Sequence, residues 1–334
     1  MRKFNFLRRA LYALTLFFPF SCEPPAGGGD EISPFQDVVT VANNTVSFKS
    51  IQAYRNLIDN GTDETRAELV KFVNDVKGFR SLKEQVMSQA ASGKTKESEF
   101  VTDDDFITKL LNQDGIIKLG DYFFQIDLNK STVLVSINKA DLEGENLKNA
   151  MVFSTDENVL ELMEAGYTNS PDYGADTRGR TDFWKWFCRD RRAKSQQKQS
   201  KNDDLAYGDS STSTDRSYSA KVELEYNAVG IYFELKADVK SLKYQVPFWF
   251  DNVNDGFARI ITNNYYFRVR CGRSEFASHD WPTYSFANSP GKCKQTYFSS
   301  TSALQNYEVT VTFYYNHVNS EVGAKSITYR IADY

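Results

Sequence analysis

In residues 221–239, KVELEYNAVGIYFELKADV, apolar and charged side chains alternate along the chain. A period of two places the apolar side chains on one face of a β-strand and the charged side chains on the other. The same alternation recurs at 265–271, 307–315 and 325–331. Several half-buried strands without a helical period between them predict an all-β antiparallel sandwich, jelly-roll or immunoglobulin-like, for residues 217–334. Half of the aromatic residues fall in this range, and they favour strands and fill a thin core.

Upstream, residues 46–165 mix helical periodicity with β-branched runs, which predicts an α+β N-terminal domain. Helices are expected after Ser50 and after Thr62, because both hydroxyl residues precede an apolar stripe and can cap a helix. The stretches 81–84 (SLKE) and 154–157 (STDE) have the capping-box pattern that precedes a helix.

One β-hairpin is expected within this N-terminal domain. Its arms are residues 116–126 and 132–137, both rich in β-branched and aromatic side chains, and its turn is 127–130. A linker then follows at 166–216, because this range loses periodicity and gains Gly, Asp, Ser, Gln and Lys. The aromatic knot at 183–188 (FWKWFC) is expected to dock onto a neighbouring domain.

The first residues predict export. Residues 1–21 form a signal peptide, with four cations before an apolar run at 10–20 that spans only about 16 Å as a helix, against about 30 Å of hydrocarbon. Ser21 and Cys22 follow, then a Pro/Gly-rich tether within 22–45. This arrangement resembles a bacterial lipoprotein signal, which implies lipidation of Cys22 and a membrane anchor at the outer membrane or cell surface. The alternative is an ordinary signal peptide, with Cys22 left for a disulfide.

Charge and cysteine content narrow the function classes. Loss of residues 1–21 changes the formal net charge from −4 to −8, which argues against a nucleic-acid partner. The basic stretch 189–201 has the composition of a solvated linker. In an oxidising compartment Cys271 and Cys293 are the expected disulfide, with Cys188 a buried thiol; three free thiols are the alternative.

No catalytic, metal or cofactor site is predicted. His279 and His317 are the only histidines, no Gly-x-Ser-x-Gly elbow is present, and no Cys-x-x-Cys pair occurs. Residues 251–256 (DNVNDG) have half of a calcium-loop pattern, but Val253 and Thr262 stand where ligands are required, so a β-turn is expected.

A set of aromatic residues is the candidate ligand-binding site. Its members lie near expected loops or strand ends, and they are Trp249, Trp281, Tyr284 and Tyr265. Exposed aromatic rings on a sandwich suit stacking on sugars and anchoring of protein partners. The alternative for each of them is a place in the core.

Four stretches of the N-terminal half carry a family resemblance: 46–50 (VSFKS), 78–82 (GFRSL), 115–122 (GIIKLGDY) and 151–160 (MVFSTDENVL). They resemble an uncharacterised family of secreted Bacteroidota proteins, many of them lipoproteins. The resemblance implies a location and an architecture, and it brings no catalytic residue.

Together these features predict a cell-envelope lipoprotein that binds a glycan or an envelope protein. A structural envelope component is one alternative, and a secreted hydrolase is the other. Exposed aromatic residues favour the binding protein. Co-purification with other lipoproteins would favour the structural component, and an acidic cleft would favour the hydrolase.

Overall fold

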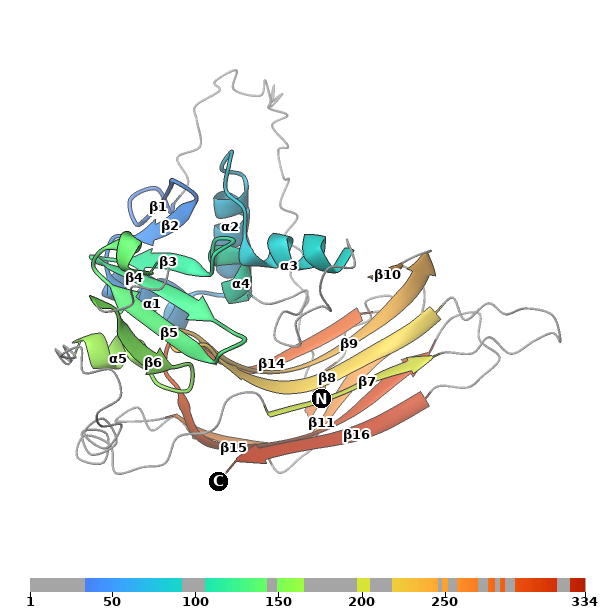
Figure 1. The fold of residues 1–334 in the computed structure, drawn as a ribbon. Helices are drawn as coiled ribbons and strands as arrows, with labels where there is room; N and C mark the ends of the chain where they lie inside the picture. Colours follow the sequence, from blue (N-terminus) through green and yellow to red (C-terminus); the bar gives the residue numbers. More distant parts are fainter. Residues whose placement is uncertain are drawn as a thin grey trace, which may run out of the picture. The chain divides into compact units, whose positions relative to one another are not determined.

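The computed structural model describes eleven segments of the chain: 34–91, 106–142, 149–164, 197–204, 218–245, 248–251, 257–269, 276–279, 283–285, 292–316 and 325–333. These residues are mostly β, with few helices (Figure 1). The helices are α1 (Ile51–Asn60), α2 (Asp63–Asn74), α3 (Leu82–Ala91), α4 (Phe106–Leu110), the short 3₁₀ helix η1 (Lys139–Leu142) and α5 (Val159–Glu164). None of these helices is long and apolar enough to cross a bilayer.

The strands form three sheets. The first has the order β1 (Val39–Ala42), β2 (Thr45–Phe48), β3 (Ile116–Leu119), β4 (Tyr122–Asp127), β5 (Thr132–Ser136), β6 (Met151–Ser154). The second has the order β10 (Phe248–Asp251), β9 (Phe233–Gln245), β8 (Tyr218–Ala228), β7 (Gln197–Asp204), with β14 (Lys292–Ser300) also paired to β9. The third has the order β12 (Phe276–His279), β11 (Phe257–Val269), β15 (Leu304–Asn316), β16 (Lys325–Asp333), with β13 (Thr283–Ser285) paired to β11.

Helix caps predicted from the sequence are confirmed at three places. The Ser50 hydroxyl accepts a hydrogen bond from the Ala53 amide at 3.0 Å, and Thr62 caps α2 in the same way. At α3 the capping box is reciprocal: the Glu84 amide donates to the Ser81 hydroxyl, and the Ser81 amide donates to the Glu84 carboxylate. Side-chain oxygens thereby satisfy amides that have no partner inside the helix.

Two expectations for the N-terminal half are wrong in detail. Residues 116–126 are not one hairpin arm but two strands, because Gly120 adopts a φ of +61° and turns the chain between β3 and β4. The helix expected after the 154–157 stretch is present as α5, but Asn158 and not Ser154 caps it. The Glu157 carboxylate accepts from the Ser154 amide within a turn, and Asn158 caps α5 by accepting from the Glu161 amide.

Among the described strands of the C-terminal part every pair is antiparallel, as predicted. Apolar side chains from the second and third sheets, such as Leu224 on β8 and Val309 on β15, belong to one hydrophobic core cluster. Strand β7 lies inside the range 166–216, whose composition predicted a linker. It pairs along its whole length with β8, so these eight polar residues are part of a sheet.

The turn between β8 and β9 joins the two hydrophobic cores. Val229, Ile231 and Tyr232 pack in the core of the first sheet and its helices, while the strands on either side of the turn supply the second core. The carbonyl of Gly230 accepts from the Val159 amide at 2.9 Å, and the Tyr54 hydroxyl donates to the carbonyl of Ile231 at 3.3 Å.

The charged face of β8 and β9 is buried, not solvated, so the expectation of half-buried strands is wrong here. Six charged side chains are 1–3 % exposed: Glu223, Glu225, Glu234, Lys236, Asp238 and Lys240. Ion pairs across and along the strands compensate their burial. Lys236 lies 3.2 Å from Glu225 and 3.0 Å from Glu234, and Lys240 lies 3.4 Å from Asp238.

Substitution of Gly230 tests how tightly the turn is held. Gly230 has a φ of +79°, and a Cβ there would lie 2.7 Å from Val133 Cγ2 and 3.0 Å from Val159 Cγ2. We expect Gly230→Ala to lower the free energy of unfolding by about 2–4 kcal/mol, from the left-handed backbone plus overpacking. Urea denaturation of the two proteins measures this difference in the free energy of unfolding.

The matched control is Gly78→Ala, where φ is +92° but no atom lies within 4 Å of the added Cβ. Only the backbone term applies there, so the loss should be about 1–2 kcal/mol. Equal losses at the two positions would contradict the packing of the turn against Val133 and Val159.

Loss of the central lysine tests the buried ion pairs. Lys236→Met leaves Glu225 and Glu234 without that cation in a buried site, so we expect the free energy of unfolding to fall by about 3–5 kcal/mol. Arg330→Met is the control, because Arg330 pairs with Glu308 at 2.9 Å on an exposed surface where water screens the interaction. If Lys236→Met lowered the free energy of unfolding no more than Arg330→Met, the burial of the Lys236 ion pairs would be refuted.

Candidate functional site

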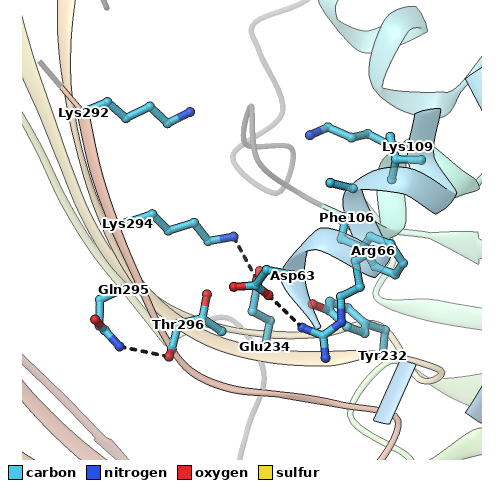
Figure 2. Close-up of a pocket in the computed structure, with 12 residues that line it drawn as sticks. Asp63, Arg66, Phe106, Lys109, Tyr232, Glu234, Lys292, Lys294, Gln295 and Thr296 are labelled. Carbon is cyan, nitrogen blue, oxygen red and sulfur yellow. Dashed lines mark hydrogen bonds and ion pairs between the residues drawn. The ribbon is translucent and has the colours of Figure 1, made fainter. Parts of the chain in front are cut away.

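A cavity of about 530 Å³ lies between two helices and the edge of the second sheet (Figure 2). Its volume is in the usual range for small-ligand sites. Helices α2 and α4 form one wall, and β9, β14 and the residue before β9 form the other. The lining residues are Asp63, Arg66, Ala67, Val70, Phe106, Lys109, Tyr232, Glu234, Lys292, Lys294, Gln295 and Thr296.

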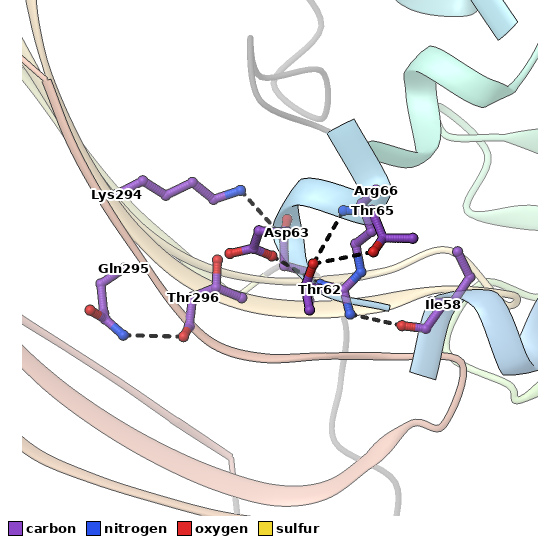
Figure 3. A network of polar contacts seen from close by, with 9 residues as sticks. Ile58, Thr62, Asp63, Thr65, Arg66, Lys294, Gln295 and Thr296 are labelled. Carbon is purple, nitrogen blue, oxygen red and sulfur yellow. Dashed lines mark hydrogen bonds and ion pairs between the residues drawn. The ribbon is translucent and has the colours of Figure 1, made fainter. Parts of the chain in front are cut away.

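Helix α2 presents one face to the cavity. Asp63, Arg66, Ala67 and Val70 stand at i, i+3, i+4 and i+7, which share a face of an α-helix, while Leu69 is fully buried on another face. The position of α2 follows from its Thr62 cap, where the Thr62 hydroxyl accepts from the Thr65 amide and also bonds the Thr65 hydroxyl (Figure 3).

Arg66 is held by two partners. One guanidinium nitrogen lies 3.2 Å from the Asp63 carboxylate, and another donates to the carbonyl of Ile58 at 2.8 Å (Figure 3). Ile58 is in the last turn of α1, where carbonyls lack partners inside the helix. Arg66 therefore fixes the end of α1 against α2 while its side chain lines the cavity.

The opposite wall depends on Glu234. Its carboxylate lies 3.2 Å from the Lys294 ammonium on β14 and 3.0 Å from that of Lys236 on its own strand. Lys292, Lys294 and Thr296 alternate along β14, so their side chains share the face that lines the cavity. Glu234 and Lys294 therefore connect this cavity wall to the buried ion pairs of the second sheet.

Two aromatic rings close the inner side of the cavity. Phe106 of α4 packs on Tyr232 with ring centroids 5.6 Å apart, and both side chains are buried. Burial raises the pKa of the Tyr232 hydroxyl well above its ordinary value, and the nearby Glu234 carboxylate raises it further. The hydroxyl therefore stays protonated and neutral at physiological pH.

The lining is positively charged. It holds four cationic side chains and two acidic ones, and each acid is ion-paired with a lining cation. No histidine or cysteine lines it, and no group of three metal-ligating side chains occurs among the described residues.

The predicted aromatic set is spread over two sheets. Trp249 stands on β10 of the second sheet, opposite Tyr244, whereas Tyr284 stands on β13 of the third sheet, opposite Ile261. Tyr265 on β11 packs on Tyr297, with ring centroids 5.6 Å apart, next to the second core. Trp281 lies outside the described residues, and the binding role of all four stays a prediction.

The cysteine and histidine predictions are also untested. Cys293 is buried in β14, between the cavity-lining Lys292 and Lys294. Its predicted partner Cys271 lies outside the described residues, as do Cys22, Cys188 and His317. His279 ends β12, where it stands opposite Tyr265 in the register.

Sequence reasoning missed the cavity, because its walls come from residues 63–109 and 232–296 and no local spacing links them. Two signals were present in part. The polar residues along one face of α2, and the polar residues at alternate positions of β14, each indicate a face outside the apolar core. Neither pattern shows that these two faces lie opposite each other.

No protein-family model matches this chain. No curated protein matches it either. A crystal structure of a DUF4848 family protein from Bacteroides thetaiotaomicron VPI-5482 is similar over 88 % of this chain and 100 % of that one, with 13 % identity and a TM-score of 0.17. A TM-score this low carries no argument about family, fold or function.

Proposed function

We propose that the chain is an exported lipoprotein, anchored through Cys22 at the outer membrane or cell surface, that binds a glycan. Its architecture would be an α+β domain followed by an antiparallel sandwich. The alternation in the β strands, and the single core cluster formed by the second and third sheets, support this architecture.

The observation that carries the binding role is the cavity between α2, α4, β9 and β14. It has the volume of a small-ligand site, and its lining combines aromatic and charged side chains. Within that lining, hydrogen bonds and ion pairs hold Arg66 and Lys294, so part of the site is already ordered without a ligand.

A glycan fits this site better than an envelope protein does. A protein partner typically buries about 800 Å² on each side of a broad interface. A cavity of about 530 Å³ instead matches a few sugar units or the end of a longer chain. An envelope protein as the ligand is an outcome that the experiment below can reveal.

Filling the cavity from α2 tests the proposal. Ala67 is exposed and lines the cavity, so Ala67→Trp should occupy the space without disturbing the core. The full chain is offered a panel of neutral and acidic oligosaccharides and, separately, an extract of envelope proteins, and we expect it to retain glycans. We expect Ala67→Trp to lose that binding by at least about tenfold, because the ring excludes the ligand.

Asn74→Trp is the matched control, since Asn74 is exposed on the same helix and does not line the cavity. It should bind like the unchanged protein. Equal binding by the Ala67→Trp and Asn74→Trp proteins would place the site elsewhere. Retention of an envelope protein, with no glycan bound, would exclude glycan binding.

The lipid anchor is tested by the intact mass of the mature protein from native membranes. We expect a chain that begins at Cys22 and carries acyl mass, because two or three acyl chains hold a protein in a bilayer at about 0.8 kcal/mol per buried CH₂. A Cys22→Ala protein should lack that mass and leave the membrane fraction. An unacylated mature chain would contradict the anchor.

A further inference from the structure

We infer that the cavity selects a neutral saccharide, whose neighbouring hydroxyl groups are held between Asp63 of α2 and Lys294 of β14. This inference rests on the proposed glycan binding and specifies its chemistry. Both residues line the cavity, one on each wall, and in Figure 2 the Lys294 side chain extends from β14 toward Asp63.

The charged side chains of the lining already have partners. Asp63 is ion-paired with Arg66, and Glu234 is ion-paired with Lys294, each at 3.2 Å. The other two lysines that line the cavity also have interaction partners. An anionic ligand would have to compete with these partners for a cation, whereas a neutral hydroxyl group can bond to a paired charge without displacing its partner.

Asp63 and Lys294 keep hydrogen-bonding capacity beyond their ion pairs. Arg66 contacts Oδ1 of Asp63, so Oδ2 can accept a further bond, and the Asp63 side chain is 81 % exposed. The Lys294 ammonium contacts one carboxylate oxygen with one of its several N–H donors, and its side chain is 28 % exposed. Within the part of the chain that the structure describes, Asp63 and Lys294 form no ion pair with each other, so a ligand group can enter between them.

Hydroxyl groups match this combination of an acceptor and a donor, because each hydroxyl both donates and accepts. One sugar hydroxyl can donate to the Asp63 carboxylate while its neighbour on the ring accepts from the Lys294 ammonium. Hydrogen bonds with one charged partner are stronger than those between neutral groups. Thr296, two residues further along β14, adds a hydroxyl to the same face of the strand.

The apolar part of the lining suits the remainder of a sugar ring. Ala67 and Val70 lie on the same face of α2 as Asp63, and Phe106 of α4 also lines the cavity. The C–H groups of a sugar can pack against these side chains while its hydroxyl groups reach the polar ones. The lining therefore offers both kinds of contact that a neutral saccharide makes.

Isothermal titration of the full chain with matched pairs of trimers tests the inference. Each pair shares its linkage and differs in charge: a galactose trimer with a galacturonic acid trimer, and a mannose trimer with a mannuronic acid trimer. We expect a neutral trimer to bind at least about tenfold more tightly than its acidic counterpart, whose carboxylates approach Asp63 and Glu234. Added salt should change the neutral affinity by less than about twofold, because the ligand carries no charge to screen.

Variants locate the binding groups. Asp63→Asn and Lys294→Met should each weaken the neutral trimer by about tenfold, and Lys294→Arg should keep most of the affinity. Glu64→Gln and Lys71→Met are the matched controls, because both residues are exposed on α2 and do not line the cavity. Thermal melting of every variant separates loss of binding from loss of folding.

Every outcome bears on the inference. Equal or tighter binding of the acidic trimers, or an affinity that falls steeply with salt, overturns the neutral preference and leaves glycan binding intact. Neutral binding that neither Asp63→Asn nor Lys294→Met weakens excludes these two residues as the binding groups. No binding by any of the trimers refutes the inference, and the wider oligosaccharide panel with Ala67→Trp decides the proposed function separately.

Discussion

The turn between β8 and β9 constrains everything that surrounds the cavity. A Cβ at Gly230 would lie 2.7 Å from Val133 Cγ2 and 3.0 Å from Val159 Cγ2, so the turn packs against the first core with no room for a side chain at this residue. Strand β9 begins at Phe233, three residues after Gly230, so Glu234 lies close to this contact along the chain. A second tie acts on the neighbouring strand: the Asp59 carboxylate of α1 accepts three hydrogen bonds, two from Thr301 and one from Ser300, at 2.8–2.9 Å. Both strands of the cavity wall are therefore held against the first sheet and its helices, β9 through β5 and α5, and β14 through α1.

The buried charges of β8 and β9 also restrict the register in which these strands can pair. A slip of one residue would move Lys236 and its neighbours into the apolar core and the apolar side chains onto the charged face. Buried ion pairs often contribute little net stability compared with apolar residues of the same size. Their consequence here is that a single register satisfies both faces. This register places Lys294 opposite Asp238, and the Lys294 ammonium lies 3.2 Å from the Glu234 carboxylate.

Local patterns predicted local structure. Ser50, Thr62 and the Ser81–Glu84 pair were identifiable because a cap depends on neighbours three residues away. The turn at Gly120 was missed because a continuous apolar run hides a tight turn, and β7 was missed because its composition is polar. The alternation in β9 predicted the strand but not the burial of both faces. Contacts between residues far apart in the sequence decide which parts of the chain cover a charged face and which elements enclose a cavity. Local patterns do not reveal such contacts.

The two cavity walls come from distant parts of the sequence, so a ligand that contacts both would also stabilise the fold. One wall belongs to helices within residues 63–110, and the other belongs to strands that follow residue 232. A ligand that contacts both walls binds only when the turn and the Asp59 contacts have brought them together. Such a ligand stabilises the native state by mass action, by about 2.7 kcal/mol at a concentration one hundred times its dissociation constant. Binding and folding of these two regions would therefore be coupled in the proposed role, and the stability of the chain would rise with ligand concentration.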